Sequence, residues 1–192
     1  MADHTDTVLR ALRERLSPSA VSHCERVSAT AAGLAESYGV DTQSARLAGL
    51  LHDWHRDTPG EDLLKRARRL GLAITDVDEM VPYLLHGPVA AEEIDDVVPG
   101  VDLAVRDAVA AHTYGAPTMS DLAKIVYIAD MIEPARHHDH ADALRQAAGP
   151  VDLDELFARA YTASVAHLIR ARRPLHPVTV AVYNRYVARR PR

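Results

Sequence analysis

The stretch Leu50-Leu51-His52-Asp53-Trp54 places an imidazole and a carboxylate side by side at the end of an apolar segment. Apolar residues recur at helical intervals before it, which predicts a core helix over about 41–55. An unpaired carboxylate buried at the end of such a helix would cost several kcal/mol or become protonated. Asp53 therefore needs a cation or strong hydrogen-bond donors, although an aspartate exposed at a helix end would also produce this dipeptide.

Helical spacing of apolar residues continues through most of the chain, and no segment shows sustained alternation of apolar and polar residues. The pattern predicts an all-α fold in a single domain over residues 1–192. Helices are expected at about 5–16, 19–38, 41–55, 61–71, 75–85, 88–96, 102–113, 120–132, 152–172 and 177–189. Asp41 is expected to cap the third of these. We also expect a break at 86–88 and an exposed loop at 136–140.

The composition excludes several classes of protein. The net charge of the 192 residues is −5, which argues against a long nucleic acid as partner. Lysine occurs only at positions 65 and 124, so phosphate contacts are expected from arginine or a metal, which favours a small phosphorylated ligand. One cysteine, no signal-peptide pattern and no long apolar stretch predict a cytoplasmic protein without a membrane partner. A homo-oligomer is left open.

Three further helices place an ionisable side chain on an apolar face. His23 shares a face with Val27, and His112 shares one with Val109. A lone inward histidine is more often a hydrogen-bonded core residue than a ligand. Asp130 lies on the inward stripe of its helix, where an unpaired carboxylate would be costly, and it is the strongest single indication of a site.

His86 follows two leucines and precedes Gly87-Pro88, where a helix break would aim its imidazole into a cleft. A surface loop histidine is the alternative. Several apolar segments that each direct a histidine or aspartate inward rarely arise by coincidence, so together they indicate one shared site. The candidate metal ligands are His23, His52, Asp53, His86, His112 and Asp130.

The order of these residues along the chain resembles the HD-domain superfamily of metal-dependent phosphohydrolases. Four stretches resemble, more narrowly, the YqeK-type family of symmetrical bis(5′-nucleosyl)-tetraphosphatases: AGLLHD at 48–53, LHGPV at 85–89, HTYG at 112–115 and IADMIEPAR at 128–136. The similarity spans about residues 20–136. It implies an HD-domain helical bundle with a metal-binding core over about 19–136 and C-terminal helices over about 152–189.

The resemblance implies two divalent metal ions, with iron as the expected metal and manganese also suited to a shell of imidazoles and carboxylates. His23, His52, Asp53 and Asp130 would hold one ion, and Asp53, His86 and His112 would hold the other. Asp53 would bridge the pair.

The same resemblance implies the reaction. A hydroxide that bridges the two ions would attack a polyphosphate, and diadenosine tetraphosphate would be split symmetrically into two ADP. The expected catalytic residues are Asp53, Arg56 and His86. The candidates for holding the substrate phosphates are Arg56, Thr113 and Arg136.

Two positions depart from the family's pattern. The usual His-Asp-x-Ala-Lys is His-Asp-Trp-His55-Arg56 here, so an arginine replaces a phosphate-facing lysine and an extra imidazole is present. Ala90 stands where the family usually has glycine. The change at Arg56 keeps open another nucleotide substrate, such as a nucleoside monophosphate, a dNTP or a cyclic dinucleotide. A non-catalytic nucleotide-binding module is the remaining alternative.

Overall fold

The computed structural model describes residues 4–137 and 140–188. Over these residues it contains helices and turns and no β-strand, which confirms the predicted all-α class. The α-helices are α1 (Thr5–Arg15), α2 (Pro18–Tyr38), α3 (Thr42–Leu51), α4 (Gly60–Arg69), α5 (Asp76–Met80), α6 (His86–Glu93), α7 (Leu103–Ala111), α8 (Asp121–Ile132), α9 (Ala141–Ala147), α10 (Leu153–Arg170) and α11 (Pro177–Val182). Shorter segments are the 3-10 helices η1 (Pro82–Leu85) and η2 (Ile94–Asp96) and the π-helix η3 (Tyr183–Val187).

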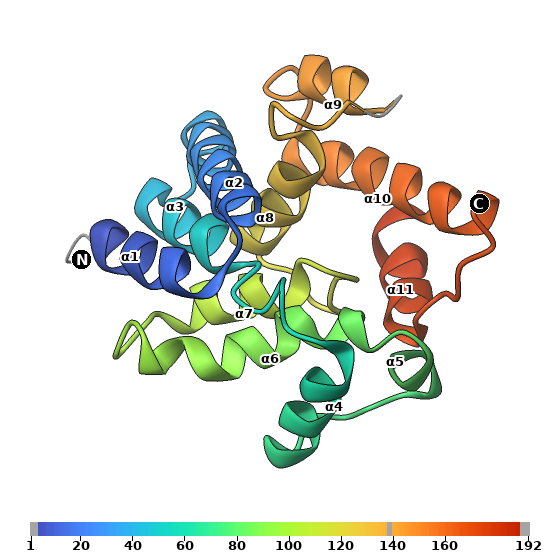
Figure 1. Cartoon of the computed structure of the whole chain (residues 1–192). Coiled ribbons are helices and arrows are strands. Elements are labelled where there is room, and N and C mark those ends of the chain that lie inside the picture. Colours follow the sequence, from blue (N-terminus) through green and yellow to red (C-terminus); the bar gives the residue numbers. More distant parts are fainter. Residues whose placement is uncertain (1–3, 138–139, 189–192) are drawn as a thin grey trace.

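Helices α2, α3, α7 and α8 form the centre of the molecule (Figure 1). α2 packs against α3 and α8, and α7 packs against α3, α6 and α8. Gly49 allows α3 to approach α2 closely, because a Cβ atom at this position would lie 2.7 Å from Cα of Ser28. The apolar faces predicted for these helices are buried against one another, with Val27 and Val109 fully inaccessible to solvent.

Helix α3 begins as predicted but ends earlier. The Asp41 carboxylate accepts a hydrogen bond from the backbone N–H of Ser44 at 2.7 Å, which confirms the expected cap. The helix ends at Leu51, and residues 52–57 form turns. The backbone N–H of Trp54 bonds to the carbonyl three residues earlier, in the tighter 3-10 pattern. The His-Asp dipeptide therefore lies in a turn that follows the helix.

The structure corrects the expectations around residues 86 and 141. His86 begins helix α6 and does not lie in a break, because Pro88 falls in the first turn, where its missing N–H costs no helical hydrogen bond. Helix α9 was not anticipated. The last expected helix continues beyond α11 as the π-helix η3. Residues 138–139 of the expected loop and residue 189 of that helix lie outside the described residues.

The C-terminal helices α10 and α11 lie on the opposite side of the central helices from α1 (Figure 1). α10 packs against α8 through aromatic contacts. The ring centroid of Tyr127 lies 5.5 Å from that of Phe157 and 5.3 Å from that of Tyr161. This aromatic contact joins the C-terminal helices to the central ones.

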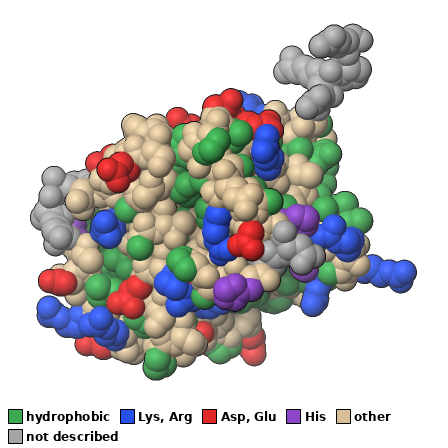
Figure 2. Space-filling view, turned by 90° about the horizontal axis from the view of Figure 1, so that it is seen from above, with side chains coloured by type: hydrophobic (Ala, Val, Ile, Leu, Met, Phe, Trp, Pro, Cys, Tyr) green, Lys and Arg blue, Asp and Glu red, His purple; other side chains and the backbone are tan. Residues whose placement is uncertain are grey.

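The surface in Figure 2 shows basic and acidic side chains interspersed over the face in view. In the described part of the chain, no helix combines the length and the hydropathy of a membrane span.

Candidate metal centre

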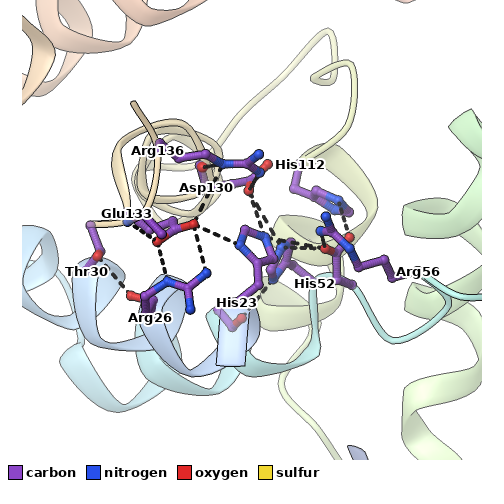
Figure 3. Close-up of polar contacts among 12 residues, drawn as sticks. His23, Arg26, Thr30, His52, Arg56, His112, Asp130, Glu133 and Arg136 are labelled. Atoms are coloured by element: carbon purple, nitrogen blue, oxygen red, sulfur yellow. Dashed lines mark hydrogen bonds and ion pairs between the residues drawn. The ribbon is translucent and has the colours of Figure 1, made fainter. Parts of the chain in front are cut away.

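The six side chains grouped by the sequence analysis meet between the central helices. Five elements deliver them: His23 from α2, His52 and Asp53 from the turn after α3, His86 from the start of α6, His112 from the end of α7 and Asp130 from α8. Figure 3 shows four of them, His23, His52, His112 and Asp130, directed toward one another. All are buried except the Asp130 side chain, which is 25% exposed. The cluster therefore has one partly open side.

Asp53 lies at the centre of the cluster. Its Oδ1 is 3.1 Å from Nε2 of His86 and 3.7 Å from Nε2 of His112. Its Oδ2 is 3.3 Å from Nε2 of His52 and 3.4 Å from Nε2 of His23. The two carboxylate oxygens thus face two different pairs of imidazoles, which is the geometry that a bridging ligand requires.

The ligand atoms form two overlapping groups. His23, His52 and Asp130 each offer one atom within 4.8 Å of the others, and so do His52, Asp53 and His112. His86 joins the second group from the side, with its Nε2 only 2.9 Å from Nε2 of His112. Two adjacent groups of this kind could hold two neighbouring cations.

The hydrogen bonds on the outer side of each imidazole orient the rings. Nδ1 of His52 donates to the carbonyl of Gly49 at 2.8 Å, and Nδ1 of His112 donates to that of Val109 at 2.7 Å. Nδ1 of His86 likewise donates to the Tyr83 carbonyl at 2.6 Å. A carbonyl only accepts, so each Nδ1 carries the hydrogen and each Nε2 of a neutral ring presents a lone pair to the cluster.

This donor set fits divalent cations. Lone pairs of several imidazoles face one another and two carboxylates at short distances, an arrangement that positive charge stabilises. Nε2 of His23 and of His52 are buried and, within the described part of the chain, make no hydrogen bond of good geometry, although carboxylate oxygens lie 3.0–3.4 Å away. Burial, together with His86 and His52, lowers the pKa of His112 to about 3, so its ring is neutral near pH 7. Without a metal, protons on Nε2 of His52 and His86 supply the positive charge instead: burial opposes ionisation of Asp53, but these two protonated rings hold its pKa well below the ordinary value.

The three candidate phosphate-binding residues lie beside this cluster. Arg56 donates to Oδ2 of Asp53, and Arg136 donates to Oδ1 of Asp130 at 2.6 Å. Their side chains are 32% and 35% exposed, so both are partly open to solvent. Thr113 is half-buried, with Oγ1 3.4 Å from Nε2 of His112. Arg56 and Arg136 thus each contact one carboxylate of the cluster, and Thr113 contacts one of its imidazoles.

The family model for the HD domain matches residues 20–135, a span that contains all six clustered side chains. The chain belongs to the HD domain family. A curated relative from Bacillus subtilis (strain 168), named "Bis(5'-nucleosyl)-tetraphosphatase, symmetrical", is 30% identical over 93% of this chain and 95% of its own length. A relative of the same name from Staphylococcus aureus (strain NCTC 8325 / PS 47) is 31% identical over 92% of this chain and 91% of its own length.

A solved structure shares the complete HD-domain fold. It is the "predicted HD superfamily hydrolase involved in NAD metabolism" from Clostridium acetobutylicum, which is 35% identical to this chain with a TM-score of 0.88. The match covers 94% of this chain and 95% of the other. The similarity therefore extends from the HD core into the C-terminal helices.

Glu133 is a residue of this HD-domain site that the sequence analysis did not single out. It is 2% exposed, and its Oε1 lies 3.2 Å from Nδ1 of His23. Arg26 donates to both of its oxygens (Figure 3). Burial opposes ionisation, but the Arg26 guanidinium and the neighbouring N–H groups lower the pKa of Glu133 to about 2. The carboxylate therefore orients His23, as outer partners of metal-binding histidines commonly do.

We expect Glu133→Gln to weaken the affinity for Mn²⁺ about 10- to 100-fold, because His23 loses its charged partner. Titration against a competing chelator measures the effect, and thermal unfolding shows whether the variant is folded. The control is Glu36→Gln at an exposed position of α2. Equal affinity in the folded Glu133 variant and the wild type would show that His23 needs no such partner.

His55, the extra imidazole of the HD-domain turn, is fully buried in a polar cluster. Its Nε2 lies 2.9 Å from Oε2 of Glu93, and its Nδ1 lies 2.8 Å from Nη2 of Arg15. Arg15 also donates to the carbonyl of Trp54 at 2.8 Å. Arginine only donates, so Nδ1 accepts and Nε2–H donates to Glu93. The cluster joins α1 and α6 to the turn that carries Asp53.

We expect His55 to make the metal-free protein less stable as the pH falls below about 6.5. Burial and the Arg15 charge lower the pKa of His55 from 6.5 to about 4. Between pH 6.5 and about pH 4 the unfolded chain therefore binds more protons than the folded protein. The contribution of His55 to stability is fully present above pH 6.5 and is lost as the pH falls toward about 4. Urea unfolding across this pH range should show that the free energy of unfolding depends less on pH in His55→Gln than in the wild type. His167→Gln, exposed on α10, is the control, and identical slopes for both variants would contradict the assignment.

Proposed function

We propose that this HD-domain protein is a metal-dependent hydrolase that splits diadenosine tetraphosphate symmetrically into two ADP. The observation that carries the proposal is the central Asp53, whose two oxygens face separate pairs of imidazoles. The relatives named as symmetrical tetraphosphatases, which align over more than nine-tenths of the chain, support this substrate. Hydrolysis of a phosphoanhydride suits a paired cation site with adjacent arginines, because both neutralise charge on phosphoryl oxygens.

The six clustered residues would hold two divalent ions in this proposal, with Asp53 shared between them. Bound cations of this kind lower the pKa of a coordinated water and neutralise charge on phosphoryl oxygens. Iron is our proposed metal, and manganese suits the same mixed ligand shell. The cytoplasmic location, the division into a core over about 19–136 and C-terminal helices, and any oligomeric state stay predictions.

The arginines would hold the remaining phosphates. Each guanidinium has five N–H donors in a planar fork, more than the contacts to Asp53 and Asp130 use. Arg56 pairs with Asp53 in the turn after α3, and Arg136 pairs with Asp130 in α8. The two arginines can therefore contact one polyphosphate at two points. Their role is to orient the phosphorus under attack and to stabilise the charge that develops on its oxygens.

Anaerobic turnover of diadenosine tetraphosphate by protein loaded with iron or manganese tests the proposal, with products separated by ion exchange. ADP alone is the expected product. AMP with ATP would refute symmetrical cleavage. Absence of turnover with two bound metals per chain would refute this substrate and direct the search to nucleoside monophosphates, dNTPs and cyclic dinucleotides.

A further inference from the structure

A small cavity of about 110 Å³ lies between the metal centre and the C-terminal helices. Leu84 and Thr113 line it on the side of the centre, and Ser164 and His176 line it on the side of α10 and α11. The volume exceeds the space of a single water, about 30 Å³ in the liquid. It is smaller than the roughly 300 Å³ of a pocket that encloses a complete small-molecule ligand. The cavity therefore suits one ring system of a larger ligand.

The near wall of the cavity borders the metal centre. Thr113 directly follows His112, and its hydroxyl lies 3.4 Å from Nε2 of that residue. Leu84 lies two residues before His86, next to Tyr83, whose ring stacks on the His86 imidazole with centroids 4.4 Å apart. A ligand whose phosphates occupy the centre could thus extend a ring past Thr113 into the cavity.

The walls offer aromatic surfaces in fixed orientations. The Tyr114 ring stacks on His176 with centroids 4.1 Å apart and an interplanar angle of 16°. His176 is held on both sides, because its Nε2 lies 3.2 Å from Oδ2 of Asp78 and its Nδ1 accepts from the backbone N–H of Val178. Tyr161 donates to the backbone carbonyl of Tyr114 at 2.7 Å. Fixed aromatic surfaces of this kind bind nucleobases by stacking.

The far wall lies outside the residues that the HD family model matches. The HD family model ends at residue 135, whereas α10 and α11 begin at Leu153 and Pro177. The tetraphosphatase relatives nevertheless align over 92–93% of this chain, so their similarity includes these helices. A helix pair that lies within the similarity to these relatives but outside the HD family model is where a preference among phosphorylated ligands can be built.

We propose that this cavity is the nucleobase subsite of the enzyme. The cavity takes one base of a nucleoside polyphosphate whose phosphates lie at the metal centre. The placement of those phosphates rests on the proposed function. Stacking supplies most of the affinity for the base, and Thr113, Ser164 and Thr179 are the lining residues that carry a hydroxyl group on an aliphatic side chain.

Two substitutions of Ser164 test the subsite. Ser164→Leu fills the cavity from α10, and Ser164→Ala removes the same hydroxyl and its hydrogen bond to Tyr127 without filling it. Calorimetry with the Mn²⁺-loaded protein would measure the binding of ADP and of methylenediphosphonate, a diphosphate analogue without a base. We expect the leucine variant to bind ADP about tenfold more weakly than the alanine variant. Methylenediphosphonate should bind all three proteins equally.

Equal ADP affinity in the two variants would overturn the proposal, and so would a wild type that binds ADP no tighter than methylenediphosphonate. If Ser164→Leu does not fold, Leu168→Phe narrows the cavity from a half-buried position one turn later and carries the same expectation. These binding measurements are separate from turnover. A protein that shows the expected ADP discrimination but does not split diadenosine tetraphosphate retains the subsite and loses the proposed reaction.

Discussion

Asp53→Asn should lower kcat/KM for diadenosine tetraphosphate roughly 10²- to 10³-fold and reduce the metal content of the protein. Asp53 approaches all four imidazoles of the cluster, so its charge contributes to both groups of ligand atoms. Asparagine keeps the size of the side chain but replaces one anionic oxygen by an N–H donor, which repels a cation. The loss of an electrostatic contribution worth several kcal/mol in the transition state corresponds to such a factor.

Metal analysis and steady-state kinetics of the purified variant measure this effect. Asp57→Asn is the matched control, because Asp57 lies in the same turn, is exposed and accepts a hydrogen bond from the backbone N–H of Ser17. The control should retain both metals and near-normal activity. A folded Asp53 variant with two metals and full activity would mean that the centre does not depend on this carboxylate.

Gly87→Ala should disrupt the second group of ligand atoms. An added Cβ would lie 2.9 Å from Cε1 and 3.0 Å from Nδ1 of His112, and 2.9 Å from Oγ1 of Thr113. The His112 ring cannot move without cost, because it is buried and bonded to the carbonyl of Val109. We expect the free energy of unfolding to fall by about 1–3 kcal/mol, which is typical of overpacking. We also expect the metal content to fall from two ions toward one.

Chemical denaturation and metal analysis check this prediction. Gly33→Ala in α2 is the control, since an added Cβ there meets no heavy atom within 4 Å and alanine is the better helix former. That variant should be as stable as the wild type or slightly more stable. If Gly87→Ala keeps two ions and its stability, His112 is free to shift and the tight contact has no functional consequence.

Local sequence determined the all-α class and the inward direction of His23, His112 and Asp130. Both follow from the 3.6-residue period, because a side chain that shares a helix face with buried apolar residues is itself directed inward. The structure brings these three together with His52, Asp53 and His86, although their role as metal ligands stays a prediction. The start of α6 was missed because the proline tolerated in a first helical turn resembles a helix breaker.

Only the tertiary structure decided which groups surround the ligands. The contact between Glu133 and His23 joins residues 110 positions apart, and the one between His55 and Glu93 joins α6 to the turn after α3. Glu133 lies within the stretch 128–136, but nothing in the sequence around a glutamate before proline indicates that it contacts His23. Helical periodicity sets the direction of a side chain and not its distance from another helix. That distance depends on packing, as at Gly49 against Ser28, so these contacts exist only in the assembled bundle.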